Sequence, residues 1–338
     1  MKALVIEAVG QTRLRDIEQR EPGPLDVVVE VTVVGLCGSD LNTFRGLNPL
    51  VELPRIPGHE VSGKIIAKGA GVGAEPRLGQ QVIVWPYTAC GHCTSCRAGR
   101  GYACRYNKTL GVQQDGALLK RLVLPAANVI PNDALPPRLQ ALVEPISVGF
   151  HAAARGRVAS GEWVVVLGCG MIGIGAILAA AARGARVIAV DPIVEKAQVA
   201  IEMGAEIFTP LTGAALLAEI DRITGGDGAA VVIEAVGMPE TFTLAIDAAA
   251  YCGRVVYVGY SKAHVTYDTR KFNLKELDIF GSRNASRADF AAVIARLTSL
   301  GPAAESLISR VFPMAEAEQA FPYWSENRNG VMKIMVEP

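Results

Sequence analysis

The stretch Trp163–Asp191 reads WVVVLGCGMIGIGAILAAAARGARVIAVD and contains an apolar run, a glycine turn, an alanine-rich helix and a second apolar run. The glycines at 168, 170 and 173 follow the pattern GxGxxG. Such a turn presents free backbone N–H groups at a helix N-terminus, where the helix dipole also favours the negative charge of a pyrophosphate. The stretch therefore predicts an α/β domain that binds a dinucleotide.

The context of the glycine turn supports this prediction, because a lone GxGxxG is often only a loop. Here a strand precedes it, a helix follows it, and Asp191 closes the second apolar run. A carboxylate there binds ribose hydroxyls and repels a 2′-phosphate, and no arginine follows in the next three residues, which predicts NAD(H) over NADP(H). Asp191 as a helix N-cap is the alternative. The predicted cofactor-binding residues are Gly168, Gly170, Met171, Ile172, Gly173 and Asp191.

Apolar runs alternate with helix-length segments from about residue 153 to about residue 282, which is typical of a doubly wound parallel sheet, the Rossmann fold. The predicted strands are Trp163–Leu167, Arg186–Val190, Glu206–Thr209, Ala230–Ala235, Arg254–Gly259 and Leu277–Gly281. Before this region, short runs punctuated by glycine and proline indicate a β-rich domain. These runs include Val27–Val34, Val61–Ile66 and Gln81–Trp85.

The tail contains an amphipathic helix, Arg287–Leu297, and a short strand, Val331–Val336, and it is too short for a third domain. We expect it to complete the first domain. At 338 residues the chain is long enough for about two domains. The predicted boundaries are 1–150 with a metal-binding lobe at 87–106, a coenzyme domain at 151–283, and a C-terminal segment at 284–338.

The composition is that of a globular enzyme, with 33 basic and 33 acidic residues and half of the chain apolar. This balance gives no reason to expect nucleic acid or an anionic membrane as partner. The N-terminus lacks the apolar region of a secretory signal, and the longest apolar stretch, Met171–Ala182, is too short to span a bilayer. We therefore expect a cytoplasmic protein with reduced cysteines.

Four of the seven cysteines, Cys90, Cys93, Cys96 and Cys104, lie within fifteen residues in CGHCTSCRAGRGYAC. Four thiolates can close a tetrahedral Zn²⁺ site that has no open position, so this site is predicted to be structural. Unrelated buried or disulfide-bonded cysteines are the alternative. His92 is expected to be a surface residue, and we expect Cys169 and Cys252 to be small buried residues.

A second group of possible ligands comprises Cys37 in GLCGSD, His59 and Glu60 in PGHE, and Glu144 in LVEPISVGFH. Each alone fits a packing, capping or solvated role. Together they offer sulfur, nitrogen and oxygen donors, the mixture expected of a catalytic zinc that keeps one position for water or substrate. A ligating histidine also needs a partner on its other ring nitrogen, which the sequence does not identify.

Several motifs together resemble the zinc-dependent medium-chain dehydrogenase/reductases over essentially the whole chain. They are GHExxG at Gly58–Gly63, the four-cysteine lobe, EPxSVxxH at Glu144–His151 and the glycine turn. The resemblance is strongest to the polyol branch, which includes sorbitol dehydrogenase and bacterial hexonate dehydrogenases. It implies a GroES-like catalytic domain, a Rossmann coenzyme domain and an active site in the cleft between them. It also implies two zinc ions per chain, NAD, and a homodimer or homotetramer paired through the last strand of the coenzyme domain.

The resemblance assigns Cys37 and His59 as catalytic zinc ligands and Glu60 as the acid that ligates zinc in polyol dehydrogenases. Glu144 matches a second acid that either ligates directly or holds the zinc-bound water, and Ser39 matches the hydroxyl that passes on the alcohol proton. Liver-type enzymes continue this relay with a histidine, where this chain has Asn42. Because an amide does not titrate, we expect the proton to leave through water held by Glu60 or Glu144.

The predicted reaction is the transfer of a hydride to NAD⁺ from a secondary alcohol of a polyol or sugar acid, with zinc as the Lewis acid. Arg283, within FGSRNASRADF at 280–290, is a candidate for binding a substrate carboxylate; a surface role or a contact with cofactor phosphates is the alternative. Phe44 and Trp85 are weaker candidates for the pocket, because large apolar residues are more often core. L-threonine 3-dehydrogenase, a general secondary-alcohol dehydrogenase and an NAD-binding regulatory protein are the alternative functions.

Overall fold

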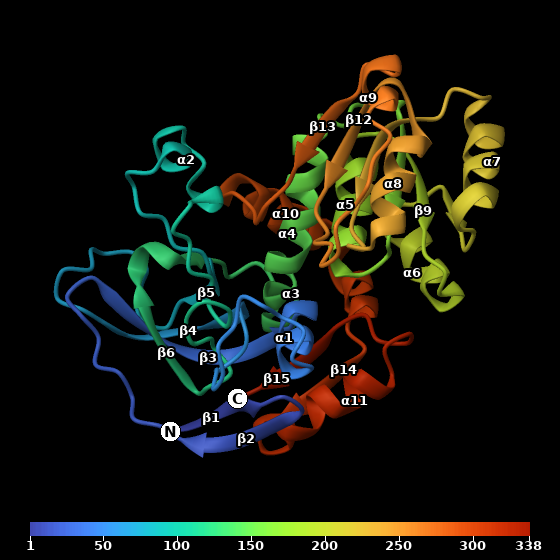
Figure 1. Ribbon diagram of the computed structural model, residues 1–338. Helices are drawn as coiled ribbons and strands as arrows, with labels where there is room; N and C mark the ends of the chain where they lie inside the picture. The colour runs from blue at the N-terminus through green and yellow to red at the C-terminus, as the bar shows by residue number, and fades with distance from the viewer. The chain divides into compact units, whose positions relative to one another are not determined.

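In the computed structural model, which describes residues 1–338, strand β8 (Trp163–Leu167) lies inside a six-stranded sheet, of which β9, β12 and β13 are labelled in Figure 1. The strand order is β10-β9-β8-β11-β12-β13, and every neighbouring pair is parallel. The chain therefore builds outward from β8 in one direction and then from β11 in the other, as in a complete dinucleotide fold. The predicted parallel sheet is confirmed.

The other strands of this sheet follow the predicted runs closely. They are β9 (Arg186–Val190), β10 (Ile207–Thr209), β11 (Ala229–Glu234), β12 (Ala249–Tyr257) and β13 (Asp278–Gly281). Only β12 differs by more than a residue or two, because it begins at Ala249 rather than at Arg254. Its first residues pair with β11 before a register shift, and Cys252 in this region has a positive φ of 56° and an exposed side chain, contrary to expectation. An interrupted, partly exposed pairing has no clear apolar pattern to reveal it.

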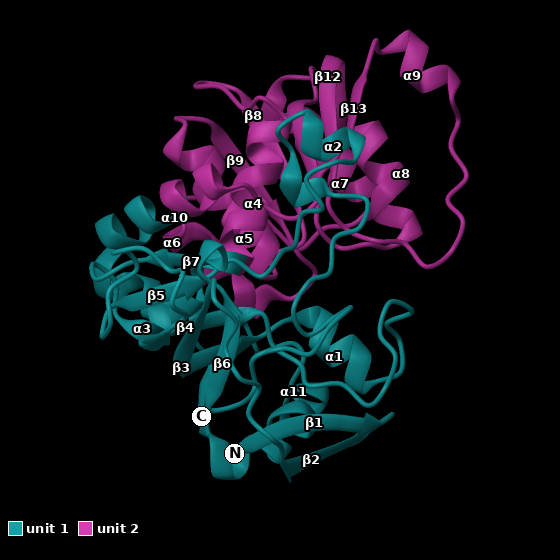
Figure 2. Ribbon diagram, turned by 90° about the vertical axis from the view of Figure 1, so that its left-hand side faces the viewer, with its two compact units in different colours: residues 1–144, 293–338 teal, residues 145–292 magenta.

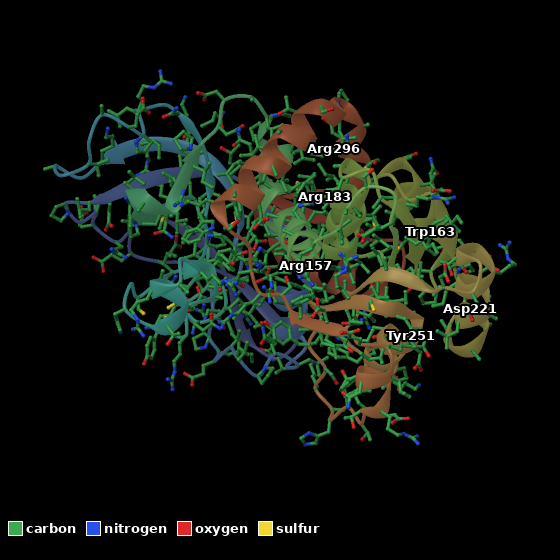
Figure 3. All side chains as sticks on the ribbon, turned by 90° about the horizontal axis from the view of Figure 1, so that it is seen from above. Arg157, Trp163, Arg183, Asp221, Tyr251 and Arg296 are labelled. Atoms are coloured by element: carbon green, nitrogen blue, oxygen red, sulfur yellow. The ribbon has the colours of Figure 1, made fainter.

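Helices cover both faces of the parallel sheet. They include α5 (Met171–Ala182), α6 (Ala197–Glu202), α7 (Gly213–Thr224), α8 (Pro239–Ala248) and α9 (Arg270–Leu274). Val165 and Leu167 of β8 pack with Leu216 and Ile246 from α7 and α8, whereas α5 lies on the opposite face. At the start of β8, the Trp163 ring lies 3.9 Å from the Arg186 guanidinium (Trp163 is labelled in Figure 3).

Gly173 explains the close packing of α5 against the glycine turn. A Cβ atom at this position would lie 1.7 Å from the carbonyl oxygen of Gly168, well inside van der Waals contact. Only glycine allows the first turn of α5 to approach the loop that follows β8 this closely. The third glycine of the fingerprint is thus required by packing, independently of any ligand.

The N-terminal part of the chain and the C-terminal tail together form a mostly antiparallel seven-stranded sheet in the order β14-β15-β3-β4-β5-β7, with β6 also paired to β3. These strands are β3 (Asp26–Leu36), β4 (Glu60–Lys68), β5 (Gln81–Val84), β6 (Arg121–Pro125), β7 (Val129–Pro131), β14 (Arg310–Pro313) and β15 (Ile334–Glu337). A separate hairpin comprises β1 (Lys2–Ala8) and β2 (Gln11–Asp16). The β-rich domain is therefore observed, and the C-terminal strand returns to pair with β3.

The helices around this sheet are short. They are α1 (Gly38–Phe44), α2 (Thr94–Arg97), α3 (Pro137–Ala141) and α11 (Ala320–Glu326). Phe44 of α1 stacks on Phe321 of α11 with ring centroids 5.3 Å apart, and both rings belong to the hydrophobic core. The tail thus contributes core side chains as well as a strand.

The chain divides into unit 1, residues 1–144 and 293–338, and unit 2, residues 145–292 (Figure 2). These divisions differ by several residues from the predicted boundaries at 150 and 283. Two helices account for the difference, because α4 (Val143–Arg155) and α10 (Arg287–Leu300) each run across a division. None of these helices combines the length and the hydropathy that a membrane-spanning helix requires.

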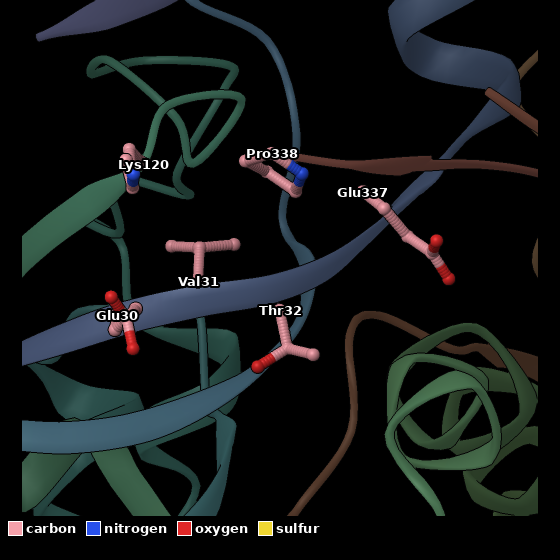
Figure 4. Close-up of a pocket in the computed structure, with 6 residues that line it drawn as sticks. All are labelled: Glu30, Val31, Thr32, Lys120, Glu337 and Pro338. Carbon is pink, nitrogen blue, oxygen red and sulfur yellow. The ribbon is translucent and has the colours of Figure 1, made fainter. Parts of the chain in front are cut away.

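Unit 1 has a surface hollow of about 430 Å³ where β6 leaves β3 (Figure 4). It is lined by Glu30, Val31, Thr32, Lys120, Glu337 and Pro338. None of the predicted site residues lies there. The hollow follows from the sheet topology, because β6 and β15 pair with different halves of β3 and leave a gap between them.

Candidate active site and metal centres

Cys37 lies between β3 and α1, where it forms the N-cap of the helix. Asp40, the third residue of the helix, accepts a hydrogen bond from the backbone N–H of Cys37 at 2.9 Å. The other carboxylate oxygen of Asp40 accepts one from the N–H of Gly58 at 3.3 Å. Asp40 is 1% exposed, so one buried carboxylate fixes both the cysteine loop and the loop that carries His59.

Glu60 is the first residue of β4 and lies opposite the end of β3, and His59 immediately precedes it. In the antiparallel register Glu60 pairs with Gly35, and a Cβ atom at Gly35 would lie 2.1 Å from Oε2 of Glu60. The missing side chain of Gly35 therefore leaves the space that the carboxylate occupies. The sheet register thus places Glu60 next to the end of the strand that leads to Cys37.

The ligand atoms of Cys37, His59 and Glu60 all lie within 4.8 Å of one another, and His59 and Glu60 are buried. Burial alone would lower the pKa of His59, but Asp40, Cys37 and Glu144 raise it well above its usual value. The surroundings of the imidazole thus favour a positive charge. A divalent cation satisfies the same requirement, and a sulfur, a nitrogen and an oxygen donor suit zinc.

Nδ1 of His59 is buried without a hydrogen-bond partner, 3.9 Å from Oδ1 of Asp40. The partner that a ligating histidine requires is therefore present nearby as a carboxylate, although at more than hydrogen-bond distance. The donor set therefore fits a bound zinc, and Nδ1 of His59 faces the carboxylate that would orient the ring.

Glu144 is buried in the first turn of α4 but is not part of the three-residue cluster. It accepts a short hydrogen bond from the hydroxyl of Tyr87, whose ring meets Trp85 edge-on at 5.5 Å. Burial, the largest effect, raises the pKa of Glu144, and the nearby Glu60 raises it further. His59 and the hydrogen bond from Tyr87 lower it, but the pKa is raised overall. The two predicted acids therefore have different surroundings.

The sulfur atoms of Cys90, Cys93, Cys96 and Cys104 also lie within 4.8 Å of one another. Backbone N–H groups point at these sulfurs, from Cys93 to Cys90 and from Tyr106 to Cys104, each at 3.3 Å. A hydrogen bond with Ser95 is the largest cause that lowers the pKa of Cys93, to about 5. No disulfide is present, so the arrangement suits four thiolate ligands of a structural zinc.

Replacing Cys104 with serine is expected to remove one zinc ion per chain and to lower Tm by about 5–10 °C, since a structural zinc contributes folding free energy directly. Zinc content by mass spectrometry and a thermal melt measure the two effects. Cys252→Ser, at an exposed cysteine, is the matched control. An unchanged zinc content in Cys104→Ser would contradict the structural site.

The glycine turn of unit 2 is fixed by Asp191 at the end of β9. Oδ2 of Asp191 accepts a hydrogen bond from the N–H of Cys169 at 2.8 Å, and Oδ1 accepts one from the N–H of Ile193 at 3.0 Å. Lys196 donates to Oδ2 at 2.9 Å. Asp191 does not cap the following helix α6, whose N-cap is Lys196. The carboxylate thus supports the turn and brings a lysine to the expected ribose position.

Other predicted residues have less specific surroundings. Ser39 and Asn42 are half-buried on α1, and Phe44 packs in the core, which favours a structural role for it. Trp85 is half-buried and contacts Tyr87, the partner of Glu144. Arg283 is exposed. His92 is exposed as expected, with its Nδ1 2.9 Å from the carbonyl oxygen of Cys90.

Sequence reasoning missed four residues that hold the candidate sites: Asp40, Tyr87, Lys196 and Lys333. Asp40 had a local signal, since CGSD places an acid three residues after the N-cap. Lys333 lies 273 residues from its partner Glu60, and no local pattern joins them. His151, to which the sequence assigned no role, forms a hydrogen bond with Asp289 in unit 2 at 2.9 Å.

Two family models match most of the chain. Residues 23–136 match the alcohol dehydrogenase GroES-like domain, and residues 172–299 match the zinc-binding dehydrogenase domain. The first match contains His59, Glu60 and the four-cysteine lobe, and the second begins within the glycine turn motif. Both matches agree with the fold and with the positions of the candidate sites.

Full-length relatives extend this agreement. L-galactonate-5-dehydrogenase of Escherichia coli K12 is 34% identical over 309 residues, which cover 90% of each chain. The solved alcohol dehydrogenase rspB of Escherichia coli, in complex with NADH, is 29% identical with a TM-score of 0.91, covering 100% of this chain and 99% of that one. A Sinorhizobium meliloti protein described as a zinc-binding dehydrogenase, solved with NADP, is 28% identical with a TM-score of 0.89 and the same coverage.

Proposed function

The chain belongs to the zinc-type medium-chain alcohol dehydrogenase family, and on this premise we propose that it oxidises a secondary alcohol of a sugar acid or polyol with NAD⁺. It is an enzyme of the oxidoreductase class. The observation that carries the proposal is the cluster of Cys37, His59 and Glu60, whose three different donor atoms lie within 4.8 Å of one another. These three residues would hold a zinc ion, and a site with three protein ligands would keep one position open for the alcohol.

Zinc bound by these residues supplies the Lewis acidity that lowers the pKa of the alcohol. Ser39, two residues after Cys37, is proposed to accept the alcohol proton. Asn42 cannot relay it further, because an amide does not titrate. We assign the next step to Glu144 rather than Glu60, since both carboxylate oxygens of Glu60 already accept hydrogen bonds from Lys333.

The glycine turn is proposed to hold the cofactor pyrophosphate on the N–H groups of Met171, Ile172 and Gly173 at the start of α5. Asp191 is proposed to bind the adenosine ribose, with NAD⁺ preferred because its carboxylate repels a 2′-phosphate. Lys196 neutralises part of that negative charge. The preference for NAD⁺ over NADP⁺ therefore depends on the ion pair of Asp191 and Lys196 rather than on Asp191 alone.

For the substrate we favour a hexonate, because L-galactonate-5-dehydrogenase of Escherichia coli K12 is 34% identical to this chain. Arg283 is exposed and remains the candidate partner for the substrate carboxylate. Polyols that lack a carboxylate form the second class, and L-threonine and simple secondary alcohols are the alternatives.

A screen of NADH formation at 340 nm with hexonates, polyols, L-threonine and simple secondary alcohols tests the proposal. The highest kcat/KM is expected for a hexonate or polyol. If a hexonate is best, Arg283→Ala should raise its KM about tenfold or more and leave that of a neutral polyol unchanged. A best substrate among the simple alcohols or L-threonine would contradict the proposed class.

Replacing Tyr87 with phenylalanine is expected to move the acidic limb of the pH profile of kcat/KM to higher pH. Burial already raises the pKa of Glu144, and the variant loses a hydrogen bond that lowers it. At a pH below that limb, kcat/KM of the variant should be about tenfold lower than that of the wild type, since hydrogen bonds to a charged group contribute on the order of 1.5–3 kcal/mol. Tyr251→Phe, at an exposed tyrosine labelled in Figure 3, is the control. An unchanged profile would argue against Glu144 as the proton acceptor.

The remaining properties stay predictions from the sequence and the family resemblance. They are a cytoplasmic location, a homodimer or homotetramer, and the absence of nucleic acid or membrane partners. Size-exclusion chromatography with light scattering measures the oligomeric state directly.

A further inference from the structure

Lys333 is the one buried lysine in the chain, all of which the structure describes, and 2% of its surface is exposed. It immediately precedes β15. Its ammonium donates to the carbonyl oxygen of Leu36 at 2.9 Å and to both carboxylate oxygens of Glu60 at 2.6 Å. An ammonium has three N–H donors, so these three acceptors satisfy it completely.

Packing does not require a charge at this place. A buried ion pair pays a desolvation penalty for both ions, and an apolar pair of similar size is often at least as stable. Glu60, however, has 0% exposure and belongs to the candidate metal cluster. The ion pair of Lys333 and Glu60 therefore connects the residue before β15 to the cluster. The apolar residues of the sheet already provide the core.

Acidic side chains and two cations surround the cluster. Asp40, Glu60 and Glu144 lie near it, the raised pKa of His59 favours its positive charge, and Lys333 is the cation that bonds directly to a carboxylate ligand. Gly35 closes the other side of Glu60, because a Cβ there would lie 2.1 Å from Oε2. The carboxylate is thus confined between Lys333 and the cluster, and a metal must share it with the ammonium.

We propose that Lys333 is the counter-ion that sets how tightly the metal is held, by sharing the negative charge of Glu60 with it. This inference rests on the proposed function only for the assignment of Cys37, His59 and Glu60 as metal ligands. Without a metal, Lys333 keeps Glu60 from being an unpaired buried charge. With a metal, the positive charge of Lys333 opposes that of the ion and weakens binding.

These two effects are linked in one thermodynamic cycle. Removing the charge of Lys333 destabilises the metal-free protein, and a bound divalent ion then compensates the free carboxylate of Glu60. The metal-loaded protein should therefore lose less stability than the metal-free protein, and the difference must appear as tighter metal binding. For Lys333→Met we expect a Kd for Zn²⁺ at this site that is about tenfold or more lower than in the wild type.

The experiment compares full-length wild type, Lys333→Met and Lys333→Arg, with Lys64→Met as the control at an exposed lysine on the same strand as Glu60. Competition with a zinc chelator gives Kd, and thermal melts with and without Zn²⁺ give the two stabilities. Visible absorption of the Co²⁺-substituted protein reports the ligand set independently of turnover. Lys333→Arg should stay within about threefold of the wild type, because it keeps the charge.

An unchanged Kd in Lys333→Met, with equal losses of stability in the two metal states, would overturn the proposal and leave Lys333 a structural residue. Weaker binding would also overturn it, since Lys333 would then only orient Glu60. If Lys333→Met does not fold without metal, Lys333→Gln carries the same expectation, because its amide donates hydrogen bonds without charge. Wild type that binds zinc only at the four-cysteine lobe would instead contradict the proposed metal ligands.

Discussion

Replacing His59 with alanine is expected to remove the catalytic zinc and to lower kcat/KM by on the order of a thousandfold. A metal that acts as a Lewis acid contributes several kcal/mol to the transition state, and about 1.4 kcal/mol corresponds to a factor of ten in rate. His59 supplies the one nitrogen donor of the cluster with Cys37 and Glu60. The measurements are zinc content per chain and the initial rate of NADH formation on the best substrate.

The four-cysteine lobe provides an internal reference for this variant. Its sulfur cluster has no contribution from His59, so His59→Ala should retain that zinc and lose about one of about two ions per chain. His264→Ala, at an exposed histidine, should change neither quantity. Activity within threefold of the wild type, or two retained zinc ions, would contradict the assignment of His59 as a catalytic ligand.

Local apolar patterns were sufficient to predict the parallel sheet. β8 and β9 occupy the predicted residues, because each is a continuous apolar run bounded by a glycine turn, a helix or Asp191. A strand buried on both faces has this signature along its whole length. β12 does not, since it begins with partly exposed residues before a register shift, and its start was missed for that reason.

The candidate sites show the same division between local and distant information. Residue types and spacing suggested Cys37, His59 and Glu60, and the structure brings their ligand atoms together. The groups that hold these side chains come from other elements, as with Tyr87 for Glu144 and Lys333 for Glu60. Lys333 is one of many lysines, and it meets Glu60 only when the sheet has formed. Sequence spacing therefore could not identify Lys333 as the partner of Glu60.

Replacing Asp191 with alanine is expected to reverse or abolish the preference for NAD⁺, with the ratio of kcat/KM for NAD⁺ over NADP⁺ falling by about a hundredfold. The carboxylate is expected to bind the ribose hydroxyls through charge-assisted hydrogen bonds, each contributing about 1.5–3 kcal/mol. Its removal also ends the repulsion of a 2′-phosphate. Initial rates with each cofactor at a fixed substrate concentration give the ratio.

Lys196 increases the expected gain with NADP⁺. Its ammonium is held by Oδ2 of Asp191 at 2.9 Å, with only 14% of the side chain exposed. In Asp191→Ala this cation loses its partner and becomes available to a phosphate at the same position. The double variant Asp191→Ala/Lys196→Ala should therefore lose the gain with NADP⁺ while remaining poor with NAD⁺.

A second role of Asp191 has to be separated from cofactor choice, because its Oδ2 also accepts the N–H of Cys169 in the glycine turn. Alanine leaves that buried N–H without its acceptor, which should weaken the binding of both cofactors. Asparagine keeps an acceptor oxygen and removes only the charge, so Asp191→Asn should preserve more total activity while still shifting the ratio toward NADP⁺. A fall in activity with both cofactors by the same factor, in both variants, would mean that Asp191 only supports the turn. An unchanged ratio in Asp191→Asn alone would place the discrimination elsewhere, since the negative charge is the feature that this variant lacks.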